Sequence, residues 1–518
     1  KRATGFCDKV LSGQLKGCPL WYTSIAAVMA QRVLSIEKGE SFMKYTKHLP
    51  KTDKKLSEEL REAGWQRIKE PSSLPLAVPG YFYGKLSFRR RSFMHELTKL
   101  IRQDIRPALG VTEPAAIAFS VATARRHAPG IVRRVTLRLN SGIYKNAFTC
   151  GIPSSDELGN FHAAALGAVG ADPEKGLECL KGISPEQAES ARAMVKAGKI
   201  RVEMSEISSR IFIEATVEST GGSACVTIRD AHTKIVKITE NGRIVFEKES
   251  AEPSGEESSA LIHSYTLEQL HDYVLSVPLE EIRFIQEAFL LNYALCEAGL
   301  SSGKTRFSRY LLAKNGGRII SEDEQRTASL LCNAAIEARV LGLPEPAMSI
   351  TGSGAHGIIA TMPLYAAAKV RGYSEEQLLR ATALSFLVCM YIKEYSGKLS
   401  AFCGCAIAAG TGMACGLVLL RGGSTRQMAE SINNMAGSIT GMICDGGNQG
   451  CTMKGVVAVD AAWQSVEMAM QDVFIDSVHG INAVTPEETM RNMGYIASPG
   501  MVGTEKTIVD ILREKRME

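Results

Sequence analysis

A polar segment near the middle of the sequence separates two regions with different periodicity. Residues 249–259 contain only Glu, Ser, Ala, Pro and Gly, a composition typical of a linker. From about residue 94 to residue 250, short runs alternate apolar and polar positions, whereas residues 260–518 carry an almost wholly helical pattern. The sequence therefore predicts an α+β fold, with a small antiparallel-sheet α/β half (94–250) followed by a large all-helical half (260–518).

The first half carries the clearest strand signals. One strand is expected at 131–139, between helices at 113–126 and 161–197, and shorter strands are expected at 200–204, 210–218, 224–230, 234–239 and 243–246. Asn241-Gly242 separates the last two runs, and this dipeptide favours a two-residue hairpin turn. We expect these strands to form one antiparallel sheet.

Residues 1–93 differ from the rest of the chain in charge. They hold 18 Lys and Arg against 8 Asp and Glu, so their net charge is +10, whereas the whole chain carries +5 and the remaining residues −5. An amphipathic helix then starts at Met94, with an apolar residue at every fourth position from Leu97 to Leu109. We therefore expect residues 1–93 to be a basic appendage outside the fold. The acidic body gives no charge argument for a nucleic-acid partner.

The stretch from Leu399 to Leu420 contains no charged residue and is long enough to cross a bilayer. Small residues dominate it, which favours a helix buried inside a helical body over a membrane span. The start of the sequence also lacks the apolar run and small-residue cleavage site of a secretory signal. We therefore expect a cytoplasmic protein with no membrane partner.

Five of the 13 cysteines fall between residues 403 and 451. Cys403 and Cys405 flank one glycine at the start of a helix expected at 404–420, while Cys444 and Cys451 flank a glycine-rich run. Glycines free the backbone to curl, so two thiolates seven positions apart can face one centre. Such a group suits an iron–sulfur cluster, whereas zinc prefers closer ligand pairs. Small buried residues in a Gly- and Ala-rich core explain the pattern equally well, so spacing alone does not decide.

A second motif is centred on Gly352-Ser353-Gly354. Alternating small residues in 349–358 leave several backbone N–H groups pointing one way, which suits a carboxylate or a phosphate. The alternative is a tight loop that contains a hydrogen-bonded His356. A third motif, at 110–114, contains Thr112 as a possible helix cap and a proline suited to the first helical turn, and capping alone explains it.

Two lysines lie near these motifs. Lys145 precedes Asn146 in an expected polar loop after the first strand, where its ammonium either neutralises a substrate carboxylate or is solvated. Lys393 lies shortly before the Cys403–Cys405 pair. His232, between two expected strands, is expected to be structural.

Five motifs, in order along the chain, make the sequence similar to a known family. They are 107–114 (PALGVTEP), Lys145-Asn146, 352–357 (GSGAHG), 399–406 (LSAFCGCA) and 441–446 (GMICDG). From about residue 94 to residue 515, the chain resembles the L-cysteine desulfidase family, which is related to the α chain of iron–sulfur L-serine dehydratases. The resemblance does not include residues 1–93, and it implies a serine dehydratase α-chain-like fold.

The resemblance also implies a chemistry. A [4Fe–4S] cluster with one open iron would be held by Cys444, Cys451 and either Cys403 or Cys405. The reaction would be α,β-elimination of L-cysteine to sulfide and aminoacrylate, which hydrolyses to pyruvate and ammonia, with the open iron acting as a Lewis acid. The small-molecule amino acid substrate would be bound by residues of three motifs: Thr112, Lys145, Asn146, Ser353 and Gly354.

The sequence departs from this family at Val111, where the family usually has a cysteine. Valine cannot accept a proton, so another group must remove the substrate α-proton. The candidates are His356, Lys393 and Glu113. Dehydration of L-serine by the same chemistry and a non-catalytic iron–sulfur sensor are the alternative functions. The Ala- and Gly-rich helices are compatible with a homodimer.

Overall fold

The computed structural model describes residues 65–67, 82–84, 94–153, 155–248, 261–397 and 399–515. Contacts divide the chain into two units, Lys1–Phe93 and Met94–Glu518. In the first unit, β1 (Trp65–Arg67) pairs antiparallel with β2 (Phe82–Gly84). The expected linker at 249–259 lies outside the described residues. That residues 1–93 are an appendage, and that 94–250 and 260–518 are separate domains, remain predictions.

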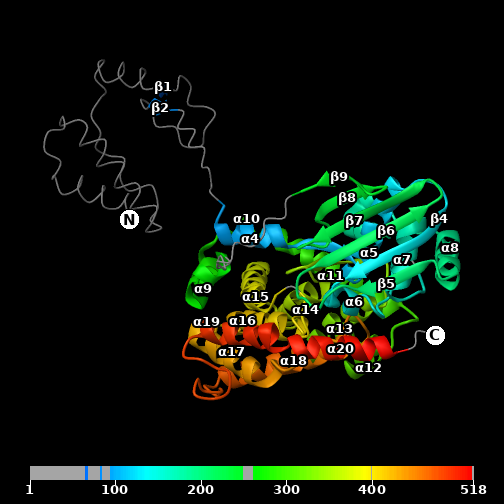
Figure 1. Cartoon of the computed structure of the whole chain (residues 1–518). Coiled ribbons are helices and arrows are strands. Elements are labelled where there is room, and N and C mark those ends of the chain that lie inside the picture. The colour runs from blue at the N-terminus through cyan, green and yellow to red at the C-terminus, as the bar shows by residue number, and fades with distance from the viewer. Residues whose placement is uncertain are drawn as a thin grey trace. The chain divides into compact units, whose positions relative to one another are not determined.

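The larger unit contains a six-stranded sheet in the order β5-β4-β6-β7-β8-β9 (Figure 1). The strands are β4 (Val132–Leu139), β5 (Ile200–Met204), β6 (Phe212–Ser219), β7 (Gly222–Arg229), β8 (Ile235–Glu240) and β9 (Arg243–Glu247). The expectation of a wholly antiparallel sheet is wrong at one edge, because β5 pairs parallel with β4. A parallel pair needs a long crossover, and the helices between β4 and β5 provide it.

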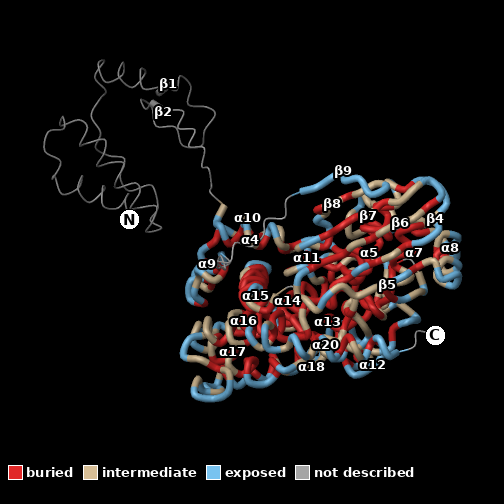
Figure 2. The backbone as a smooth tube through the Cα atoms, viewed as in Figure 1, coloured by how far each residue is buried: buried red, intermediate tan, exposed pale blue. Residues whose placement is uncertain are grey.

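Helices cover one face of this sheet. α5 (Thr112–His127) packs on β6 and β7, and α7 (Gly159–Val169) packs on α5, β4 and β5. α8 (Pro185–Lys196) lies on the outer side of α7. α5 is buried on nearly all sides, which fits its run of Ala, Val, Ile and Phe, whereas every residue of β9 is exposed at the far edge (Figure 2).

The part of the unit after residue 260 is helical, as expected. Its helices are α9 (Leu267–Ser276), α10 (Leu279–Ile282), α11 (Gln286–Ser301), α12 (Phe307–Lys314), α13 (Glu324–Val340), α14 (Gly354–Arg371), α15 (Glu375–Ser396), α16 (Gly410–Leu420), α17 (Thr425–Ile439), α18 (Gly450–Ala469), α19 (Pro486–Tyr495) and α20 (Val502–Glu514). Helices α13 to α16 are buried along almost their whole length and form the core of this part (Figure 2). Their many Ala and Gly residues allow close helix packing.

The uncharged stretch at 399–420 contains a π-helical segment (Cys405–Ala409) that continues into α16. Both are buried in the helical core, as the small residues predict. Among the described residues, no helix combines the length and the apolar character needed to cross a membrane.

Two expected elements differ near the start of the unit. The helix that begins after Met94 is α4 (Glu96–Asp104), and it ends before Leu109 because Ile105 is already extended. The next residues form β3 (Arg106–Leu109), since Pro107 disfavours a helical conformation at Arg106. β3 pairs antiparallel with β10 (Pro346–Ser349), a strand that the periodicity did not predict. This two-stranded ladder connects the start of the unit to the start of α14.

Candidate functional site

α5 follows β3 and α14 follows β10, the two antiparallel strands of one ladder. The Thr112 hydroxyl donates to the Gly352 carbonyl oxygen (3.3 Å) and joins the starts of the two helices. The expected capping by Thr112 is not observed. Val111 is the N-cap of α5, and Thr112 is the first helical residue.

The Gly-Ser-Gly motif forms a tight turn, and its second glycine, Gly354, is the first residue of α14. Thr351 (φ 48°) and Gly352 (φ 78°) are both left-handed, and Ser353 is the N-cap but supplies no side-chain hydrogen bond to the helix. The Thr351 hydroxyl lies 2.5 Å from Nδ1 of His356. This contact orients the His356 ring within the first turn of α14.

His356 and Lys393 lie against the turn between the first two cysteines. A Cβ atom at Gly404 would lie 2.8 Å from His356 Nε2 and 3.0 Å from Lys393 Cδ. Only glycine therefore fits between Cys403 and Cys405. Burial, with the nearby Lys393 charge, lowers the pKa of His356 well below its ordinary value, so the imidazole is neutral at pH 7. Burial also lowers the pKa of Lys393, whose ammonium donates to the Gly397 carbonyl oxygen (2.7 Å).

A short antiparallel bridge brings the two pairs of cysteines together. Phe402 pairs with Ile443, the Cys403 N–H donates to Met442 O (3.0 Å), and the Cys444 N–H donates to Ala401 O (2.6 Å). Cys403 and Cys444 therefore lie on neighbouring strands of the same bridge.

The 444–451 loop is fitted closely against α6 (Ser141–Asn146) and the start of α5. A Cβ atom at Gly447 would lie 2.8 Å from Asn146 O and 3.0 Å from Val111 Cγ1, so a larger residue would collide with both. The Gly447 N–H donates to Asn146 O (3.1 Å). Val111 therefore contacts the cysteine loop directly.

The four thiols influence one another electrostatically. The hydrogen bond between Cys403 and Cys405 lowers the pKa of Cys403, and the same bond raises that of Cys405. Burial, together with the charge of a neighbouring thiolate, raises the pKa of Cys444 and raises that of Cys451 to about 11. Lys454, which pairs with Asp445, is a cation beside these thiols.

A donor set of this kind fits a cluster better than a single ion. Within the described ranges, no three His, Cys, Asp or Glu side chains converge closely enough to hold one metal ion. An iron–sulfur cluster instead takes its thiolates at separate corners. One buried and three half-buried thiols, close backbone approach through Gly404 and Gly447, and a nearby cation match the need of such a cluster for thiolate ligands and charge compensation.

Lys145 lies in the same region, but all three donors of its ammonium are hydrogen-bonded within the protein. It lies in α6, not in a polar loop, and is 1% exposed. Its Nζ donates to Ser400 O (2.9 Å), Cys444 O (2.8 Å) and Glu505 Oε2 (2.7 Å). An ammonium has three donors, so none remains for a substrate carboxylate. The structure therefore favours a structural role for Lys145 over the predicted binding role.

Glu113 and Asn146 connect the start of α5 to the cysteine loop. Asn146 Nδ2 donates to Glu113 Oε1 (2.8 Å), and Asn146 Oδ1 lies 4.0 Å from Cys444 Sγ. Burial opposes ionisation of Glu113, but His232, Asn146 and the charge of Arg339 together lower its pKa, so Glu113 is ionised. His232 Nε2 lies 3.8 Å from Glu113 Oε1. His232, expected to be structural, thus borders the site.

Sequence reasoning missed Arg339, which lies in the last turn of α13. It is 4% exposed, and a Cβ atom at Gly354 would lie 2.6 Å from its Nε. The available signal was a pair of charged residues, Glu337 and Arg339, directly after the mostly apolar run 330–336. Glu337 accepts hydrogen bonds from three backbone N–H groups at the start of α12, but Nε of Arg339 has no partner among the described residues.

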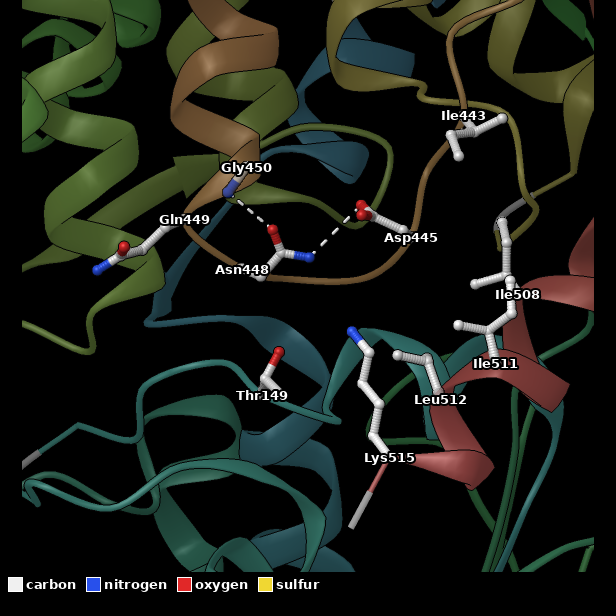
Figure 3. Close-up of a pocket in the computed structure, with 10 residues that line it drawn as sticks. All are labelled: Thr149, Ile443, Asp445, Asn448, Gln449, Gly450, Ile508, Ile511, Leu512 and Lys515. Carbon is white, nitrogen blue, oxygen red and sulfur yellow. Dashed lines mark hydrogen bonds between the residues drawn. The ribbon is translucent and has the colours of Figure 1, made fainter. Parts of the chain in front are cut away.

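A pocket opens on the outer side of the cysteine loop (Figure 3). Asp445, Asn448 and Gly450 line its wall, where Asn448 donates to Asp445 (3.4 Å) and accepts from the Gly450 N–H (2.7 Å). Lys515 extends into the space between this wall and Thr149. The loop between Cys444 and Cys451 is therefore approachable from solvent.

Comparison with known proteins identifies the family. The family model "serine dehydratase alpha chain" matches residues 174–510. The chain belongs to the serine dehydratase alpha chain family. The alpha-chain match includes His356, Lys393 and all four cysteines, whereas Val111, Glu113 and Lys145 precede it.

Relatives similar to this alpha-chain protein extend the comparison toward its N-terminus. A UPF0597 protein of Clostridium botulinum is 39% identical over 424 residues, which are 81% of this chain and 98% of the relative. UPF0597 proteins of Aeromonas hydrophila (36% over 420 residues, 80% of this chain and 95% of the relative) and Bacteroides fragilis (36% over 427 residues, 81% and 98%) are also similar. The alpha-chain family supports lyase chemistry without deciding between cysteine and serine.

Proposed function

We propose that the chain is a lyase that eliminates sulfide from L-cysteine, with a [4Fe–4S] cluster held by Cys444, Cys451 and one of Cys403 and Cys405. The observation that carries the proposal is the bridge between residues 401–403 and 442–444, which brings Cys403 and Cys444 onto neighbouring strands, while Gly404 lies against His356. When bound, the cluster supplies an open iron that acts as a Lewis acid toward the substrate.

The residues around the cysteines supply the remaining functions. We assign removal of the substrate α-proton to Nε2 of His356, because this imidazole is neutral, buried and oriented by Thr351. As the proton leaves Cα, its electron pair forms the Cα–Cβ double bond and sulfide leaves Cβ. The aminoacrylate product then takes up water to give pyruvate and ammonia.

The other two candidates for the base are less suitable. Lys393 already donates to a backbone carbonyl, and Glu113 is hydrogen-bonded to Asn146. Val111 lies beside the cysteine loop but has no group that accepts a proton.

L-Serine is the second candidate substrate, favoured by the name of the family to which the chain belongs. Hydroxide would then leave in place of sulfide, and the same base and binding groups would serve. Parallel assays of sulfide and pyruvate from L-cysteine, and of pyruvate from L-serine, separate the two substrates.

The cluster is tested by iron and acid-labile sulfide counts on anaerobically purified protein. Cys444→Ala and Cys451→Ala should each lose the cluster and all activity, and only one of Cys403→Ala and Cys405→Ala should do so. Cys415→Ala is the matched control, because Cys415 lies in the same stretch of sequence but is buried in α16. Full iron content in both Cys444→Ala and Cys451→Ala would show that the ligand assignment is wrong.

A further inference from the structure

The site contains a buried cation and a buried anion that do not pair with each other. Arg339 is 4% exposed and Glu113 is 6% exposed, and each affects its surroundings electrostatically. Nevertheless, no ion pair joins them in the described part of the chain, and Nε of Arg339 has no hydrogen-bond partner there. A buried charge without a partner is costly, so its presence calls for a ligand that supplies the opposite charge.

The guanidinium of Arg339 lies at the start of α14. A Cβ atom at Gly354 would lie 2.6 Å from Nε and 3.1 Å from Cδ, so the side chain packs directly against the first helical residue. Ser353 gives no side-chain cap, which leaves the N–H groups of the first turn available to an anion. The positive end of the helix and the guanidinium therefore favour the same negatively charged group.

Glu113 offers the complementary charge. Its neighbours Asn146 and His232 help to keep it ionised, and Thr112 links its helix to the turn before α14. His232 Nε2 is a second buried polar atom without a hydrogen-bond partner among the described residues. Arg339 and Glu113 thus influence each other through their charges, but Nε of Arg339 remains without a hydrogen-bond partner in the described part of the chain.

We propose that Arg339 and the first turn of α14 bind the α-carboxylate of a free amino acid, and that Glu113 binds its α-ammonium. This inference rests on the proposed function, and it makes the substrate class a zwitterion rather than a peptide or a carboxylic acid. It also removes Glu113 from the candidates for the base, since a carboxylate paired with the ammonium positions Cα and does not take its proton.

Isothermal titration calorimetry on the full chain tests this with three small probes that have no leaving group. L-Alanine carries both charges, L-alaninol lacks the carboxylate, and propionate lacks the ammonium. The wild-type protein should bind L-alanine at least about tenfold more tightly than either of the other two, because each of these leaves one buried charge unpaired. Equal binding of all three probes, or no binding of L-alanine, would overturn the proposal without any variant.

Variants then test which residue binds the carboxylate and which residue binds the ammonium of the ligand. Arg339→Lys should weaken L-alanine binding at least about tenfold and leave L-alaninol binding unchanged, because a lysine cannot reproduce the planar fork. Glu113→Gln should weaken L-alanine similarly and leave propionate unchanged. Arg380→Lys is the matched control, since Arg380 is another partly buried arginine whose guanidinium has carbonyl and carboxylate partners. Unchanged L-alanine binding in folded Arg339→Lys would refute the assignment.

The two proposals fail in distinguishable ways. If the wild-type protein produces neither sulfide nor pyruvate but binds L-alanine through Arg339, the lyase function fails and the zwitterion site stands. If it produces sulfide from L-cysteine and Arg339→Lys leaves KM unchanged, the lyase function stands and the zwitterion site fails.

Discussion

Two of the buried cations at the candidate site, Lys145 and Arg339, differ in what surrounds them. Lys145 is 1% exposed and its ammonium has three oxygen acceptors, whereas Arg339 is 4% exposed and its Nε has no partner in the described residues. Desolvation penalises both charges, but only the ammonium of Lys145 has all of its donors hydrogen-bonded inside the protein. Burial alone therefore does not distinguish a fully hydrogen-bonded cation from one that keeps an unpartnered donor.

The largest expected effect is on stability at Lys145. Lys145→Met leaves Glu505 buried without its cation, and breaking a buried pair in this way costs about 3–5 kcal/mol of the free energy of unfolding. Urea unfolding monitored by circular dichroism measures it. The double variant Lys145→Met, Glu505→Leu should recover part of the loss, because both charges are then removed. A Lys145→Met protein as stable as the wild type would mean that Lys145 is not a structural cation.

A smaller effect is expected on catalysis at Val111, which contacts the cysteine loop. Val111→Cys adds a group that can take a proton and is close to valine in size, so packing should survive. We expect kcat for L-cysteine to rise by up to about 10²-fold, which is the lower end of the rate gain that a positioned proton-transfer group provides. KM should be nearly unchanged. Steady-state sulfide release measures both. An unchanged kcat with intact iron content would indicate that His356 already serves as a sufficient base.

The smallest effect is expected on stability at Arg339. Arg339→Met removes a buried charge whose Nε has no hydrogen-bond partner among the described residues and keeps an unbranched side chain of similar reach, so the free energy of unfolding should change by less than about 1 kcal/mol or increase. The same urea titration compares it directly with Lys145→Met. A loss as large as that of Lys145→Met would remove the contrast between the two cations and show that Arg339 has an internal partner.

The sequence predicts much of this site because its residues are unusual for their positions. Clustered cysteines and glycines around Cys403 and Cys444 are conspicuous in the sequence, and the structure brings the two cysteines onto neighbouring strands, with Gly404 against His356. Arg339 could not be found in this way. One arginine in a helical pattern is usually solvated, and only the packing of α13 against Gly354 shows that it is buried.

The elements that escaped prediction are short ones that depend on distant partners. β10 has four residues and no periodicity of its own, and it is a strand because β3 pairs with it. The parallel register of β5 on β4 likewise depends on the crossover through α7 and α8. Long periodic helices such as α15 and α18 were predictable, since their own apolar residues specify them.

The β3–β10 ladder also determines when the site can assemble during synthesis. Leu109 pairs with Pro346, and the Thr351 N–H donates to Asp104 (2.5 Å), so the turn before α14 is completed by residues made more than two hundred positions earlier. Closing so long a loop costs chain entropy, and the contacts offset this cost only after they have formed. The pairing of β3 with β10 is therefore a slow, late step of folding. Nascent chains that stop before residue 346 therefore expose an unpaired β3 edge, and this edge is the point at which a chaperone would be needed.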